Sequence, residues 1–197
     1  MNSRVRPWMT APRFAPLLGA SIGAAGGGVY WLAALLWPTS IAVILSVLAT
    51  TLLSAAAAGA GAQAAGMGLV GFVFAILVKY DALLALSAAS LPFALPANLA
   101  LGFIMVAGHA ASRALLVSVS KPVSYGDLGI AFAIGFAPAV LIGIPGLAGL
   151  AAAIAARMLF IANLKHRRRS ATSDLDLTLQ LTEACFYLGA LATWAYV

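Results

Sequence analysis

Residues 14–37 read FAPLLGASIGAAGGGVYWLAALLW and contain no charged side chain. A helix needs about 20 apolar residues to cross the hydrocarbon core of a bilayer, so this stretch is long enough to span a membrane. Gly19, Gly23 and Gly27 recur every four residues within it, a spacing that predicts a groove of small residues for close packing of another helix. A short basic segment precedes the stretch, as in a signal peptide. The apolar stretch itself is long enough to span, which favours an uncleaved first membrane helix.

The composition of the whole chain agrees with a membrane protein. Of its 197 residues 63% are hydrophobic and only 8% are charged, and its mean hydropathy is +1.05. A soluble domain carries about 25% charged residues, so this chain has too few charges to cover a surface that faces water. We expect a single integral membrane domain over residues 1–197, with the lipid bilayer as its solvent.

The charge pattern argues against a nucleic-acid-binding protein, and the cysteine content excludes an intrachain disulfide. Eleven basic residues face five acidic ones, which gives a net charge of +6. The basic residues lie between apolar runs and form no stripe with interleaved aromatic residues, so they indicate loop topology and no nucleic-acid partner. Cys185 is the single cysteine of the chain, so no intrachain disulfide forms.

Six further apolar runs follow the first one. They cover residues 41–58, 67–91, 97–119, 128–142, 147–163 and 177–197. Strands of a membrane barrel would be about ten residues long with alternating polarity, and these runs are longer and do not alternate. Helices leave no unpaired backbone groups in lipid. The sequence therefore predicts an all-α fold, a polytopic transmembrane bundle of six to seven helices.

The distribution of basic residues predicts the orientation of this bundle. Arg4, Arg6 and Arg13 precede the first run, and a basic cluster at 165–169 follows the sixth. Basic loops face the cytoplasm, and an even number of helices separates the two clusters. Lys121 follows the fourth run and falls on the same side. We therefore expect a cytoplasmic N-terminus and a C-terminus on the outer side.

Ionisable residues inside membrane spans are costly and usually functional. The predicted spans contain Lys79, Asp81, His109, Arg113 and Glu183. Lys79 and Asp81 are two apart and point in different directions, whereas His109 and Arg113 share a helix face. Arg113, Glu183 and the nearby Gln180 gather towards the cytoplasmic side, which predicts a binding cavity there. The alternative is that Arg113 snorkels to the interface and Glu183 pairs with one basic residue for packing alone.

The sequence shows no complete catalytic set. His109 and His166 are too few for a histidine-rich metal site. Asp174 and Asp176 flank one leucine in a predicted loop, where they either cap the next helix or bind metal or phosphate.

Three stretches together point to a family. They are FAPLLGASIGAAGGGVYWLAALLWPTSIAVILSVLATTLLS at 14–54, HAASR at 109–113 and SDLDLTLQLTEACFYLGAL at 173–191. The chain resembles the cobalamin synthases, the adenosylcobinamide-GDP ribazoletransferases, which are integral membrane enzymes. The third stretch is similar to the family motif GDxLGAxQQLTExxFYL, in which Glu183 matches the glutamate and Gln180 one of the glutamines.

The resemblance implies a function in cobalamin synthesis in the inner membrane of a bacterium. The family joins adenosylcobinamide-GDP to α-ribazole or its 5′-phosphate with release of GMP, and it uses Mg²⁺. Metal and basic groups neutralise the charge that such a reaction moves. The resemblance implies contact with other enzymes of the corrinoid pathway, and it makes seven residues candidates for substrate binding: Lys79, His109, Ser112, Arg113, Asp174, Gln180 and Glu183.

The chain departs from the family pattern in its acidic motifs. The family signature HxDGLADxxDG would follow Ser54, but residues 55–61 contain no carboxylate. The next motif, close to KDSxxGxxG, would lie at about residues 60–68. Of the residues in that motif, this chain keeps only the glycines there. Mg²⁺ requires oxygen ligands, and the usual carboxylates are absent, so we expect impaired catalysis. Asp174 and Asp176 are the remaining, weak candidates for metal ligands.

Several explanations of this loss stay open at this point. The chain is a degenerate paralogue, a product of an internal deletion, or a protein with a related binding role. A small transporter and a structural subunit that positions corrinoid enzymes are the alternative functions. The intramembrane charges favour transport, but the chain lacks the internal repeat that transporters show.

Overall fold

A computed structural model describes the backbone of residues 12–58, 67–88, 97–120, 123–167 and 171–194, and the side chains of most of these residues. The described part is all-α, which confirms the predicted fold class. A short 3₁₀ helix, η2 (Pro12–Phe14), precedes seven α-helices. These are α1 (Ala15–Ala34), α2 (Thr39–Ala58), α3 (Met67–Ala88), α4 (Ala97–Ser120), α5 (Tyr125–Ile142), α6 (Ile144–Arg167) and α7 (Ala171–Trp194).

Five of these helices are long and apolar enough to cross a membrane. They are η2 with α1, then α2, α3, α4 and α5, and α6 adds a shorter apolar segment, Ile144–Phe160. Large hydrophobic side chains stay exposed along these helices, as lipid contact requires, among them Leu32, Leu52, Val70, Phe74, Leu141 and Leu159. The chain is a multi-pass membrane protein.

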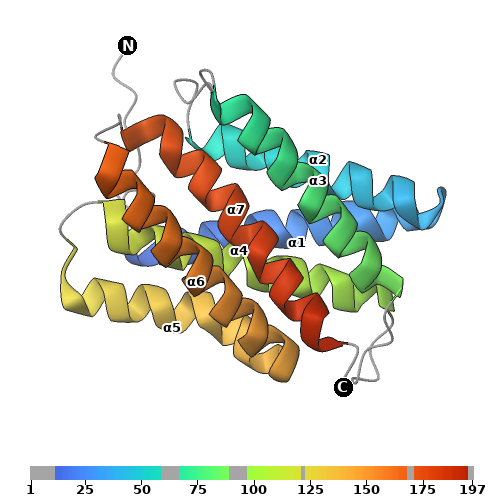
Figure 1. Cartoon of the computed structure of the whole chain (residues 1–197). Coiled ribbons are helices and arrows are strands. Elements are labelled where there is room, and N and C mark those ends of the chain that lie inside the picture. The colour runs from blue at the N-terminus through green and yellow to red at the C-terminus, as the bar shows by residue number, and fades with distance from the viewer. Residues whose placement is uncertain (1–11, 59–66, 89–96, 121–122, 168–170, 195–197) are drawn as a thin grey trace, which may run out of the picture.

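Successive helices run in alternating directions, so the odd-numbered helices start at the end of the bundle where the even-numbered helices finish (Figure 1). This end, hereafter the N-terminal end, contains the starts of α1, α3, α5 and α7 and the ends of α2, α4 and α6. α4 packs against α1, α5 and α7, and α7 packs against α3 and α6. α4 and α7 are therefore the helices through which the others meet.

The small-residue groove predicted on the first helix is confirmed, and its partner is α4. A Cβ atom on Gly23 would lie 2.6 Å from the Met105 carbonyl oxygen, and one on Gly27 would lie 2.7 Å from Cα of Gly102. A Cβ on Gly19 would collide with the His109 carbonyl. The two backbones touch along this groove, which no larger residue would permit.

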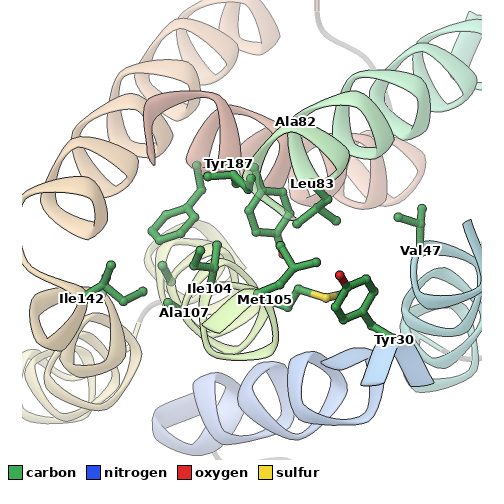
Figure 2. Close-up of a cluster of buried hydrophobic side chains, with 14 of the residues drawn as sticks. Tyr30, Val47, Ala82, Leu83, Ile104, Met105, Ala107, Ile142 and Tyr187 are labelled. Carbon is green, nitrogen blue, oxygen red and sulfur yellow. The ribbon is translucent and has the colours of Figure 1, made fainter. Parts of the chain in front are cut away.

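An apolar core joins the helices around α4. Its buried side chains include Tyr30 of α1, Val47 of α2, Leu83 of α3, Met105 of α4, Ile142 of α5 and Tyr187 of α7. Figure 2 shows these side chains converging from their different helices. Ser46 Oγ on α2 lies 2.8 Å from the Gly26 carbonyl oxygen of α1 and 3.3 Å from the Met105 sulfur of α4, so its one proton serves either acceptor. Ser46 is thus a buried polar group with acceptors on both neighbouring helices.

α5 and α6 begin earlier than the sequence predicts. Ser124 caps α5, because its side-chain oxygen accepts a hydrogen bond of 3.1 Å from the Asp127 backbone N–H. Only Gly143, at φ +84°, separates α5 from α6. The break expected between the runs 128–142 and 147–163 is therefore one residue long. Pro145 lies in the first turn of α6, where a proline replaces an N–H that has no helical partner.

The predicted loop between α6 and α7 is also shorter than expected. α6 continues to Arg167, and α7 begins at Ala171. Asp174 and Asp176 therefore lie in the first turns of a helix, and their assignment to a loop was wrong. Acidic residues are favourable there because they oppose the positive end of the helix dipole. The described residues do not include the side chains of Asp174, Asp176 and His166, nor the glycine-rich segment 59–66.

The groove yields a test of the fold with a matched control. Gly23→Ala places a methyl group against the Met105 and Val106 backbone. We expect a loss of about 1–3 kcal/mol in the free energy of unfolding, because overpacking forces two helices apart. Gly28→Ala, whose Cβ meets nothing within 4 Å, should leave stability unchanged. Unfolding in mixed detergent micelles, followed by circular dichroism, measures both; equal losses would contradict the predicted α1–α4 contact.

Candidate functional site

An ion pair buried inside the bundle joins α3 to α7. Lys79 Nζ lies 2.5 Å from Oε2 of Glu183, and both side chains are 0% exposed. The same ammonium group donates a hydrogen bond of 3.3 Å to Oε1 of Gln180, one turn before Glu183 on α7. Lys79 therefore binds two acceptors that share one face of α7.

α4 supplies the other side of this cluster. Ser112 Oγ lies 3.2 Å from Oε1 of Glu183 and 3.1 Å from the His109 carbonyl oxygen, so its one proton serves either acceptor. His109 Nδ1 is 2.7 Å from the same Glu183 oxygen. The ring N–H is not aligned with that oxygen, and neither ring nitrogen has a hydrogen-bond partner in the described part of the chain. We therefore treat the His109–Glu183 contact as electrostatic rather than as a hydrogen bond.

Arg113 lies beside the cluster and faces α2. Its Nη2 donates a hydrogen bond of 3.4 Å to Ser54 Oγ, near the end of α2. A Cβ on Gly19 would lie 2.9 Å from Arg113 Cδ. The small residue on α1 thus leaves the space through which the arginine side chain reaches Ser54.

The structure sorts the residues that the sequence singled out. It brings together Lys79, His109, Ser112, Gln180 and Glu183 and places Arg113 next to them. Asp81 is exposed on α3, as expected from its two-residue offset from the buried Lys79. The side chains of Asp174 and Asp176 lie outside the described residues, so their candidate role is not placed.

Sequence reasoning missed several buried polar residues. Ser54 ends a stripe with Ser46 and Thr50 at four-residue spacing on α2. Arg157 is buried in α6, and a charge inside an apolar run was the signal that could have revealed it. Tyr187 lies one turn after Glu183, with a buried hydroxyl that has no hydrogen-bond partner among the described residues.

The donor set of the cluster does not fit Mg²⁺. A hard dication takes several oxygen ligands, usually carboxylates. The cluster contains one carboxylate, Glu183, and Lys79 already neutralises it. Across the described residues, no group of three or more His, Cys, Asp or Glu side chains is arranged to hold a metal ion.

The chemistry that remains is recognition of a polar or anionic group. Lys79, whose charge Glu183 offsets, and Arg113 supply cationic donors, Ser112 supplies a hydroxyl, and His109 supplies ring nitrogens that have no hydrogen-bond partner among the described residues. Buried polar groups without partners are rare in native proteins. The fold and this cluster define a class: a multi-pass helical membrane protein with a charged cluster enclosed between three of its helices.

Comparison with known proteins connects this class to one enzyme. The chain is 34% identical over 132 residues to the adenosylcobinamide-GDP ribazoletransferase of Ralstonia nicotianae, a match that covers 55% of this chain and 48% of the relative. This confirms the resemblance to the cobalamin synthase family. The chain spans about half the length of the relative that it matches. No family model and no solved structure matches the chain.

The ion pair is open to a double-mutant test. Lys79→Met leaves Glu183 as an unpaired buried charge, and we expect a loss of about 3–5 kcal/mol in unfolding free energy. Adding Glu183→Leu should restore part of that loss, because the second substitution removes the orphaned charge. Asp81→Leu, two residues away on the exposed face, is the control and should not destabilise. Additive losses for Lys79 and Glu183 in detergent unfolding would show that the two side chains are not paired.

Proposed function

We propose that this chain binds the corrinoid substrate of cobalamin assembly in the membrane, as a relative of the ribazoletransferases whose catalysis is impaired. One observation carries the proposal. The HAASR stretch on α4 and the QLTE stretch on α7 are about 70 residues apart in sequence, yet Ser112 and His109 of the first contact Glu183 of the second. The residues that carry the resemblance thus meet at a single place.

The substrates of the proposed site are adenosylcobinamide-GDP and α-ribazole or its 5′-phosphate. The relative's name supports the first of these. Its diphosphate is an anion, and Lys79 and Arg113 supply cations at and beside the cluster. Arginine is well suited to this role because its planar fork of donors matches phosphate oxygens. His109 and Glu183 lie near the middle of α4 and α7, and on the orientation expected from the basic residues Arg113 lies on their cytoplasmic side.

The impairment follows from the missing carboxylates. Transfer at a diphosphate needs charge neutralisation, which the family obtains with Mg²⁺. The described residues offer no magnesium ligand set, and residues 55–61 contain no carboxylate.

Complementation tests the catalytic part of the proposal. We expect the chain not to restore cobalamin synthesis in a bacterial strain that lacks its ribazoletransferase, although the Ralstonia nicotianae enzyme does. An immunoblot of the membrane fraction must show equal amounts of both proteins. Robust growth supported by this chain, and lost in its Arg113→Ala variant, would overturn the proposed impairment.

Binding tests the other part. Purified chain in detergent should retain adenosylcobinamide-GDP in equilibrium dialysis, detected by the visible absorbance of the corrin ring. We expect His109→Ala to weaken retention by about tenfold or more, since one lost hydrogen bond to a charged group is worth about 1.5–3 kcal/mol. Asp81→Asn should bind as the unaltered chain does. Absence of binding by the unaltered chain would refute a corrinoid site.

Transport is the second candidate function, because ionisable pairs inside a membrane also mark ion and substrate pathways. The buried Lys79–Glu183 pair is the observation that favours it. Uptake of a corrinoid into proteoliposomes, abolished by Glu183→Gln, would favour transport over binding alone. Co-purification of a corrinoid enzyme with the chain would instead favour the role of a structural subunit.

A further inference from the structure

Arg157 is a buried cation outside the cluster described above. It lies on α6, is 4% exposed, and its Nη2 donates a hydrogen bond of 2.9 Å to Ser118 Oγ on α4. Ser118 in turn donates to the Leu115 carbonyl, 3.1 Å away. Serine therefore orients the guanidinium but cannot neutralise it.

The described residues give Arg157 no counter-ion. Their ion pairs join Arg13 to Asp127, Lys79 to Glu183, and His109 to Glu183, and none includes Arg157. A buried charge is costly unless an opposite charge or several hydrogen bonds compensate it. A guanidinium has five N–H donors, of which this one uses one towards the described protein. The remaining donors suit an anion with several oxygens.

The depth of Arg157 narrows the class of anion. Its partner Ser118 lies two residues before the end of α4 at Ser120, and Lys121 follows directly. Arg157 itself lies about two helical turns before the basic cluster at 165–169. Both helices end at the N-terminal end of the bundle (Figure 1). The guanidinium therefore lies at the boundary between hydrocarbon and water, which is the depth of lipid phosphates and of phosphates arriving from solution.

We propose that Arg157 and Ser118 form a phosphate-binding site between α4 and α6, which takes the phosphate group of an anionic lipid or of a soluble phosphate. Ser118 is exposed, so an anion can approach the guanidinium beside it. Arginine binds phosphate through paired N–H donors, and basic positions between membrane helices bind anionic headgroups.

This site is separate from the proposed corrinoid site. Ser118 and Ser112 are six residues apart on α4, about 9 Å along the helix axis and on different faces. Ser112 faces Glu183 of α7, whereas Ser118 faces Arg157 of α6. The experiment below contains no corrinoid, so its failure and the failure of the corrinoid proposal are distinguishable.

The test measures phosphate binding by the full chain from two sources. Native mass spectrometry from detergent micelles compares retention of phosphatidylglycerol with that of phosphatidylcholine. Isothermal titration calorimetry with inorganic pyrophosphate measures the soluble source. We expect one of the two anions to bind, and Arg157→Gln to weaken that binding by about tenfold or more. Arg13→Gln is the control, because Arg13 is an exposed cation near the start of α1 that already pairs with Asp127.

Two further variants keep the test decisive if Arg157→Gln does not fold. Ser118→Ala removes the hydrogen bond that orients the guanidinium from an exposed position and should weaken the same ligand by several-fold. Arg157→Lys keeps the charge but not the fork of donors, and should bind more weakly than the unaltered chain. Selective phosphatidylglycerol retention assigns a lipid, and pyrophosphate binding alone assigns a soluble ligand. Binding of neither anion, or equal loss in Arg13→Gln, overturns the proposal.

Discussion

The structure depends on the placement of one carboxylate. Glu183 lies inside a bundle whose outer surface is apolar, and a lone charge there would destabilise the fold by several kcal/mol. Lys79 neutralises it from α3, while Ser112 and His109 approach its other oxygen from α4. Three helices are thereby held in one register, since a shift of any of them would separate a charge from its partner. Apolar packing in lipid cannot supply that discrimination, because lipid tails are as apolar as the side chains they would replace.

The glycine groove makes this arrangement possible. The backbones of α1 and α4 touch at Gly19, Gly23 and Gly27, so α4 lies deep in the bundle with most of its side chains buried. His109, Ser112 and Arg113 are carried on that buried helix. Close packing and polar chemistry are therefore coupled: the residue that admits the Arg113 side chain, Gly19, is also one that brings the helices together.

The structure shows that residues from two of the stretches that resemble the family contact each other. A distant match to a ribazoletransferase shows similarity of sequence, but not which residues share a site. The bundle brings the α4 and α7 stretches of that resemblance into contact around Glu183. It also contains a further buried cation, Arg157, for which the described residues provide no counter-ion.

The sequence by itself determined the class of fold. Long uncharged runs such as 14–37 can only be helices in lipid, and the four-residue glycine spacing predicted close packing. It also selected Lys79, His109 and Glu183, because a charge in an apolar run is conspicuous. The tertiary structure alone decided the partners: α4 fills the groove, Lys79 faces α7 while Asp81 faces outwards, and Arg157 meets Ser118. Helix periodicity gives the direction of a side chain on its own helix, but the identity of the opposing helix depends on packing between segments far apart in the chain.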